Sequence, residues 1–153
     1  MSRVVTGDLI KLAQAGEFDV IIHGCNCFCT MGAGIAKSIK AVFPEAYAAD
    51  LTTVKGDEGK LGTYSSARIN LENKSLIIIN AYTQYHWRRR RTINADYDAI
   101  RAIFRAIKQD FAGQRIGYPA IGAGLAGGDW AVISQIINEE LAEEDHTFVR
   151  FGG

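Results

Sequence analysis

The sequence lacks a long hydrophobic run and an excess of charge of either sign. Its 17 Lys and Arg residues balance 17 Asp and Glu residues. No apolar segment approaches the roughly 20 residues that a membrane-spanning helix needs. Zero net charge gives no reason to expect a strong duplex-binding protein or a membrane partner, and residues 1–5 do not resemble a signal peptide. We therefore expect a soluble, cytoplasmic monomer.

Cysteine is also scarce: three residues, Cys25, Cys27 and Cys29, lie within five positions. Residues two apart do not easily form a disulfide, so this usage indicates a reducing compartment. Zinc pairs usually have wider spacing and a second pair elsewhere, whereas His86 and His146 are remote in sequence. We expect no metal site and interpret Cys25 and Cys27 as small buried groups. A catalytic thiol stays open, and Cys29 is the most loop-like candidate.

The 153 residues suffice for one domain with its own core, and we expect a single domain over 1–153. Extended and helical patterns alternate along the chain. We expect strands at 3–6, 19–22, 61–69, 75–82, 115–118 and 146–151, and helices at 9–15, 35–42, 44–54, 94–111 and 130–141. This alternation predicts an α/β fold with a mainly parallel sheet covered by helices on both faces. Such sheets bind ligands at the carboxyl ends of their strands.

Seven of the 16 glycines lie in two loops, each between a predicted strand and a predicted helix. The first spans 23–36, HGCNCFCTMGAGIA, and the second spans 119–130, PAIGAGLAGGDW. A helix N-terminus offers unpaired N–H groups, and glycine lets backbone approach a ligand, so each loop favours an anion site. Neither is a P-loop, and the G-x-G-x-x-G of 122–127 comes late in the chain. Side by side, the loops would suit a diphosphate; two ordinary tight turns are the alternative.

Four short motifs, in this order and spacing, resemble the macrodomain, an ADP-ribose-binding module. They are Thr6–Leu9, His23–Cys27, Met31–Ala36 and Pro119–Gly127. The resemblance covers nearly the whole chain. It implies a three-layer α/β/α sandwich with a mixed, mostly parallel sheet, and a cleft for ADP-ribose at the strand ends. It implies no cofactor.

The resemblance also implies a set of ligand-binding residues. Asp8, followed by Leu9, would accept a hydrogen bond from the adenine amino group, although Asp8 could equally be a plain helix cap. Asn26 would bond the distal ribose, since an amide both donates and accepts; its alternative role is that of a turn residue. The backbone N–H groups expected at the diphosphate belong to Gly32, Ala33, Gly34 and Ile35, and to Gly122, Ala123, Gly124, Leu125, Ala126 and Gly127.

The sequence departs from the macrodomains that remove ADP-ribose from modified molecules. Many of them carry an aspartate where this chain has Ala36, and another branch uses a lysine and an aspartate. That lysine is absent from 80–83, and the aspartate position falls at Ala126. Asp129 lies three residues later and is better interpreted as a helix cap. Both hydrolase pairs are therefore expected to be missing.

The pattern His-x-Cys-Asn-Cys instead resembles the branch that includes yeast-type ADP-ribose 1''-phosphate phosphatases. His23 and Asn26 are accordingly the expected catalytic residues, with His23 as a general base or nucleophile. The alternative for His23 is a buried histidine bonded to backbone at a strand end.

We expect hydrolysis of ADP-ribose 1''-phosphate to ADP-ribose and phosphate, without a metal. The alternatives are a hydrolase acting on ADP-ribosylated protein or nucleic acid, and a reader that binds ADP-ribose without turnover. The run Arg88–Arg91 is either a solvated loop or a surface that attracts a polyanion or a terminal phosphate. In the second case Tyr82, Tyr85 and Trp87 would be stacking surfaces.

Overall fold

The computed structural model describes residues 2–86, 94–124 and 126–152. These residues form six strands and five α-helices, with a short 3₁₀ helix, η1, at Glu58–Lys60. The strands are β1 (Ser2–Gly7), β2 (Val20–Cys25), β3 (Tyr64–Asn70), β4 (Ser75–Tyr82), β5 (Ile116–Tyr118) and β6 (His146–Phe151). The helices are α1 (Leu9–Gln14), α2 (Gly34–Val42), α3 (Pro44–Leu51), α4 (Tyr97–Asp110) and α5 (Trp130–Glu140).

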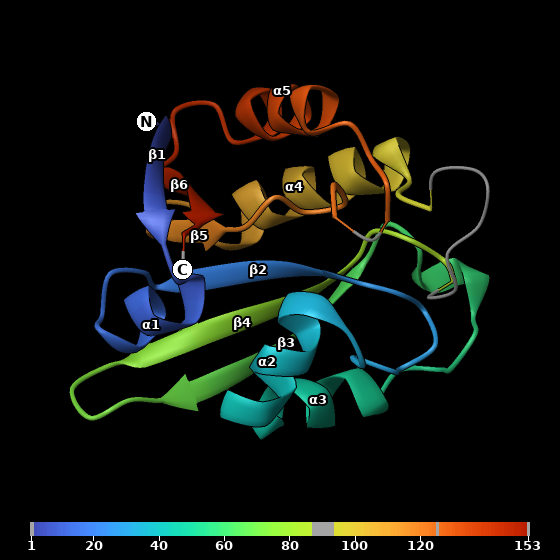
Figure 1. Cartoon of the computed structure of the whole chain (residues 1–153), viewed down its shortest axis with the longest axis horizontal. Helices are drawn as coiled ribbons and strands as arrows, with labels where there is room; N and C mark the ends of the chain where they lie inside the picture. Colours follow the sequence, from blue (N-terminus) through green and yellow to red (C-terminus); the bar gives the residue numbers. More distant parts are fainter. Residues whose placement is uncertain (1, 87–93, 125, 153) are drawn as a thin grey trace.

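The strands form one mixed sheet in the order β1-β6-β5-β2-β4-β3. The β3–β4 pair is antiparallel, and the other neighbouring pairs are parallel. The predicted α/β fold with a mixed, mostly parallel sheet is therefore confirmed. Because β2, β4 and β5 are neighbours and run in the same direction, the loops that follow them emerge at one edge of the sheet (Figure 1).

Helices cover both faces of the sheet, which gives the predicted three layers. Helices α4 and α5 lie on one side, and α2 and α3 lie on the other (Figure 1). Strand β2 shows how one sequence serves two cores: Val20 and Ile22 pack in the α4/α5 cluster, whereas Ile21 and Cys25 pack in the α1–α3 cluster. A strand buried on both faces is typical of a central parallel strand.

The amphipathic pattern of α4 explains its position. Its buried residues recur on one helix face, so that side packs on the sheet while the opposite side meets solvent. These residues are Ala99, Ile100, Ile103, Phe104 and Ile107. Among the residues that the structure describes, no helix is long and apolar enough to cross a membrane.

Some boundaries differ from those predicted. Strand β2 continues to Cys25 rather than ending at Ile22, because its residues pair with β4 as far as Cys25 opposite Tyr82. Helix α4 begins at Tyr97 rather than 94, because the Asp96 side chain accepts a hydrogen bond from Ala99 N and caps it there. Helix α3 ends at Leu51 rather than near 54. The longer β2 moves the start of the first glycine loop and places His23 inside the strand.

Candidate functional site

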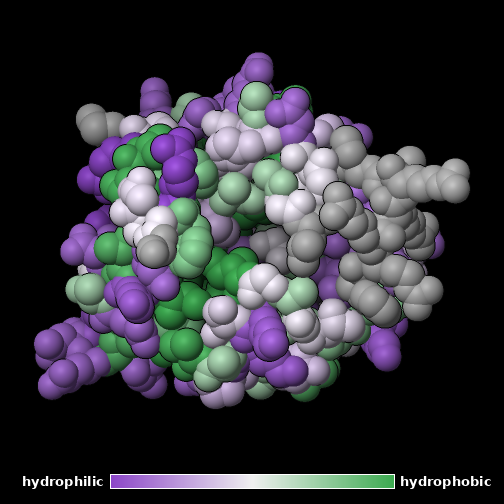
Figure 2. Space-filling view, viewed as in Figure 1, coloured by the Kyte–Doolittle hydropathy of each residue, from purple (hydrophilic) through white to green (hydrophobic). Residues whose placement is uncertain are grey.

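A pocket of about 600 Å³ opens at the carboxyl ends of β2, β4 and β5. That volume is typical of a small-molecule site. Its lining comes from four separate parts of the chain: Gly24, Cys25, Asn26, Thr30, Met31, Gly32, Ala33, Gly34, Ile35 and Ala36; Asp50; Thr83 and Gln84; Pro119, Ala120, Ile121, Gly122, Gly124 and Ala126. In the view of Figure 2, apolar and near-neutral residues gather around the middle of the molecule, and hydrophilic residues lie toward its top, left and bottom edges.

The first glycine loop lies between β2 and the N-terminus of α2. Helix α2 begins at Gly34, and its N-cap residue, Ala33, makes no side-chain capping bond. A Cβ added at Gly34 would meet no atom within 4 Å, so the space beside this backbone is open. Two residues before it carry positive φ angles that are uncommon outside glycine: Cys29 at 57° and Met31 at 40°. The start of α2 thus lines the pocket, with open space beside the backbone of Gly34.

The second glycine loop folds back on itself after β5. Gly128 N donates to Gly122 O over 2.7 Å. A Cβ at Gly128 would lie 2.5 Å from that same oxygen. Gly122 has a φ of +75°, and a Cβ there would meet Ala95 Cβ and Ile133 Cδ1 at 3.2 Å. This tight closure needs glycine at both positions.

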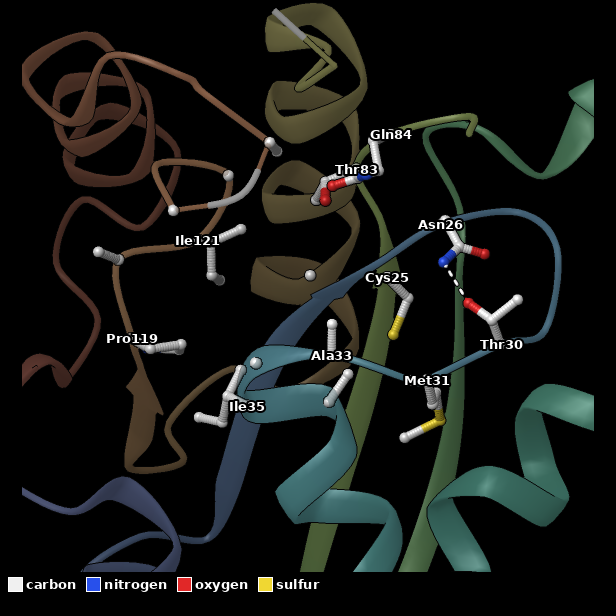
Figure 3. A pocket seen from close by; sticks show the side chains of 18 of the residues that line it. Cys25, Asn26, Thr30, Met31, Ala33, Ile35, Thr83, Gln84, Pro119 and Ile121 are labelled. Atoms are coloured by element: carbon white, nitrogen blue, oxygen red, sulfur yellow. Dashed lines mark hydrogen bonds between the residues drawn. The ribbon is translucent and has the colours of Figure 1, made fainter. Parts of the chain in front are cut away.

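The structure brings these two loops to one pocket. Strands β2 and β5 are parallel neighbours, with Val20 opposite Ile116 and Ile21 opposite Gly117. Their following loops therefore face each other across the cavity, with Ala33 and Ile35 on one wall and Ile121 on the other (Figure 3).

Asn26 lies at one end of the pocket, where its side chain organises the first loop. Its Nδ2 donates to Thr30 Oγ1 over 2.7 Å (Figure 3). Its Oδ1 accepts from Phe28 N over 2.7 Å. This is the turn role that the sequence left open. Since an amide has two N–H donors and two acceptor positions, one of each stays available for a ligand.

Asp50 and Thr83 are pocket residues that the sequence analysis missed. Asp50 is 1% exposed and Thr83 is fully buried. Tyr82 OH donates to Asp50 Oδ1 over 2.7 Å. Burial raises the pKa of Asp50, although the Tyr82 hydrogen bond and the charge of Lys60 act against it. Thr83 could have been found, because it directly follows β4 beside β2; Asp50, within an alanine-rich helix, gives no local signal.

His23 lies beside the pocket but is not among its lining residues. It is fully buried, and its Nε2 lies 2.7 Å from Asn80 Oδ1. The Asn80 amide is oriented by its Nδ2, which donates to Ala46 O and Ser65 Oγ, so His23 Nε2–H is the donor. Burial lowers the pKa of His23 to about 4, against the raising effect of that bond. This geometry fits a structural histidine better than direct catalytic contact; its partner is a side chain rather than backbone.

The predicted site residues that the structure describes either line the pocket or lie outside its lining. Those that line the pocket are Asn26, Gly32, Ala33, Gly34, Ile35, Gly122, Gly124 and Ala126; those outside the lining are Asp8, Leu9, His23, Ala123 and Gly127. Asp8 caps α1 by accepting from Lys11 N over 3.1 Å. Leu125, Trp87 and the run Arg88–Arg91 lie outside the described residues. Cys25 and Cys27 are buried free thiols.

This chain belongs to the Macro domain family, whose model matches residues 22–137. It is 33% identical over 141 residues to an uncharacterized 17.5 kDa protein of Enterobacteria phage T4, covering 89% of this chain and 87% of that protein. It is 25% identical over 141 residues to a DNA ADP-ribosyl glycohydrolase of Thermus aquaticus, covering 92% of this chain and 38% of that protein. The solved macrodomain of Thermus aquaticus DarG has the same fold, with a TM-score of 0.75 at 24% identity over 98% of this chain and 97% of that one.

Proposed function

We propose that this protein binds ADP-ribose in the pocket and hydrolyses ADP-ribose 1''-phosphate to ADP-ribose and phosphate. The observation that supports this proposal is the meeting of two glycine loops at one cavity that has Asn26 at one end. In the proposal the diphosphate lies between the backbone of 32–35 and that of Gly122, Gly124 and Ala126. The distal ribose and its 1''-phosphate lie beside Asn26.

Backbone groups would neutralise the diphosphate. No lysine or arginine lines the pocket within the part of the chain that the structure describes. The N–H groups at the start of α2, with the positive end of the helix dipole, supply the attraction instead. Ile35 and Pro119 lie at the end of the pocket away from Asn26 (Figure 3). We place the adenine toward that end, where Asp8 and Leu9 at the start of α1 remain the predicted contacts.

Two alanines in the lining favour phosphate release over removal of ADP-ribose. Ala36 and Ala126 both line the pocket. By the resemblance, these positions carry acidic residues in macrodomains that remove ADP-ribose. Methyl groups there cannot activate a water or protonate a leaving group. Phosphoryl transfer depends mainly on positioning and charge stabilisation, which backbone donors and the Asn26 amide can provide.

A second candidate is removal of ADP-ribose from a modified nucleic acid or protein. It is supported by the similarity to the Thermus aquaticus DNA ADP-ribosyl glycohydrolase. This chain covers only 38% of that protein's length, so the similarity concerns one part of it.

Calorimetry with ADP-ribose tests the binding half of the proposal. We expect Asn26→Ala to weaken binding about tenfold or more, because it removes hydrogen bonds to the ribose. Asn73→Ala, in the exposed β3–β4 turn, is the matched control and should bind like the wild type. No binding of the wild type at high micromolar ADP-ribose would contradict the proposal.

Product analysis tests the chemical half. Release of inorganic phosphate from ADP-ribose 1''-phosphate is the expected result. Release of ADP-ribose from ADP-ribosylated DNA or protein, without phosphatase activity, would instead establish the second candidate. Binding with neither activity would identify a reader.

A further inference from the structure

The pocket contains polar atoms that the folded chain leaves without partners. Among the described residues, two buried side-chain atoms lack a hydrogen bond: Asp50 Oδ2 and Thr83 Oγ1. Both residues line the pocket. A buried polar group without a partner costs roughly 1–3 kcal/mol, so two such atoms in one cavity indicate that a ligand supplies the missing partners.

The position of Asp50 reverses the usual arrangement of a surface helix. Helix α3 turns Asp50 inward, where it is 1% exposed, and leaves the adjacent Leu51 outward and 55% exposed. Burying a carboxyl group costs stability unless the group is fully paired. Residues that keep such a cost are often functional. The buried position of Asp50 in the pocket lining therefore lowers the stability of the fold, which favours a functional role for this acid.

A buried network fixes which Asp50 oxygen is free. Tyr82 OH donates to Asp50 Oδ1 and lies 2.8 Å from Ser65 Oγ. Ser65 in turn accepts from Asn80 Nδ2 over 3.0 Å, and Asn80 bonds His23. Since Oδ1 is occupied by the Tyr82 donor, a proton on Asp50 resides on Oδ2. His23 belongs to this network and helps to hold the acid in place.

The same wall places Asp50 at the Asn26 end of the pocket. Cys29 Sγ, in the loop that follows Asn26, contacts Asp50 O at 3.3 Å. Asp50 and Asn26 both line the pocket, and we place Asp50 at the end where the proposed function puts the 1''-phosphate.

Burial raises the pKa of Asp50, so this carboxyl keeps its proton to a higher pH than an exposed aspartate does. The titratable groups that act on its pKa are Tyr82 from β4 and Lys60 from η1. The charge of Asp50 in turn raises the pKa of Cys25 from β2 and of Cys27 from the first loop. Desolvation is the largest influence on its pKa and raises it, whereas Lys60 lowers it. Lys60 forms no ion pair with Asp50 within 4 Å in the described structure; its Nζ instead donates to Cys27 O.

We propose that Asp50 is a catalytic residue, the general acid for the release of the 1''-phosphate. This inference rests on the proposed function. A water attacks phosphorus, and the bond between phosphorus and the 1''-oxygen breaks with its electron pair going to that oxygen. Asp50 Oδ2–H donates its proton to the same oxygen, which gives ADP-ribose. The attacking water becomes part of the inorganic phosphate, and the proton that it loses restores Asp50.

Asp50→Asn is the direct test, because the amide keeps the size of the side chain and removes the acid. We expect ADP-ribose binding within about threefold of the wild type and a kcat for phosphate release at least about 100-fold lower. Asp57→Asn is the matched control: this exposed carboxylate lies seven positions later, outside the pocket, and should keep the wild-type kcat.

A second readout requires no variant. If Asp50 is the acid, the wild-type kcat should fall as pH rises through the pKa of Asp50 in the complex. Replacing Lys60 by Met should move that fall to higher pH, because the nearby positive charge lowers this pKa. Lys60 does not line the pocket.

The outcomes separate the two proposals. An active wild type with an equally active Asp50→Asn, or with a kcat independent of pH from about 4.5 to 9, overturns the role of Asp50 and leaves the phosphatase proposal intact. A wild type that binds ADP-ribose but releases no phosphate overturns the proposed hydrolysis, and the role of Asp50 with it.

Discussion

At the residue scale, Gly24 shows how closely packed the wall of the pocket is. A Cβ at this position would lie 2.8 Å from Thr83 Oγ1 and 3.3 Å from Ile121 Cγ2. Gly24→Ala should therefore push Thr83 out of place, destabilise the protein by about 1–3 kcal/mol, and weaken ADP-ribose binding. Urea unfolding and calorimetry measure the two effects.

Gly32→Ala is the contrasting variant at another glycine of the pocket lining. Its Cβ would meet Thr30 O at an ordinary 3.7 Å. The free energy of unfolding should thus change by less than about 0.5 kcal/mol. Binding should nevertheless fall, because the methyl group occupies space proposed for the diphosphate. Equal stability of the two variants would contradict the packing argument for Gly24.

His23 gives a second prediction at this scale, for stability against pH. Its pKa falls from 6.5 to about 4 on burial, so the unfolded chain binds its proton first as pH drops. This contribution to stability is present above about pH 6.5 and is lost as pH falls toward 4. From pH 7.5 to 4.5 the loss should be about 2.5 kcal/mol, measured by urea unfolding.

His23→Gln provides the comparison, because its amide can still donate to Asn80 Oδ1. The variant should show a shallower decline of stability over the same pH range. His146, whose pKa is also lowered by burial, contributes a decline in both proteins. Identical slopes for the variant and the wild type would show that His23 does not titrate in this way.

At the element scale, Asp129 at the start of α5 is either a helix cap or a catalytic residue, and the two roles predict different effects of substitution. Asp129 Oδ1 accepts from Ala131 N over 2.9 Å, as the sequence predicted. Asp129→Ala should cost about 1 kcal/mol of stability, whereas Asp129→Ser should cost less. Neither should change kcat for phosphate release by more than about twofold. A large loss of kcat at full stability would instead place Asp129 in the chemistry.

Elements with strong local patterns could be predicted from sequence, and residues placed by distant pairing could not. The apolar face of α4 and the glycine loops are local features, and both were predicted. The end of β2 was misplaced because His23 stays in the strand through its pairing opposite Asn80, more than fifty residues away. His23 was expected near the end of this strand, which lies two residues further on, at Cys25. Its catalytic role stays a prediction.

In the site too, features with a local sequence pattern could be predicted and residues placed by distant contacts could not. The backbone of both loops could be expected at the pocket from glycine spacing alone. Asp50 could not, since its burial depends on Tyr82 and on the segment that carries Lys60, and nothing within α3 indicates either contact. The adenine contact of Asp8 and the distal-ribose contact of Asn26 stay predictions.

At the scale of the whole molecule, ligand binding should stabilise the fold. The pocket joins loops from β2, β4 and β5, so the ADP-ribose binding that we propose requires the folded chain. At a ligand concentration of 100 times Kd, the gain is about 2.7 kcal/mol. For a protein of this size this corresponds to a rise in Tm of roughly 5–10 °C. Thermal unfolding with ADP-ribose, and with ribose 5-phosphate as the control, measures it.

A Tm that does not move at saturating ADP-ribose would contradict this expectation. The Asn26→Ala variant should show a smaller rise at the same ligand concentration. A shift of equal size with ribose 5-phosphate would show that the diphosphate contributes little.

The order of strands in the sheet also determines when each strand can pair during synthesis of the chain. Strand β1 precedes the other described strands in the chain, yet its partner is β6, with Ser2 opposite His146. The pocket's last segment, up to Ala126, leaves the ribosome before β6 does. The pocket loops can therefore form on a nascent chain in which β1 has no hydrogen-bonded partner strand. Until β6 has been synthesised, the unpaired edge of β1 is open to association with other chains.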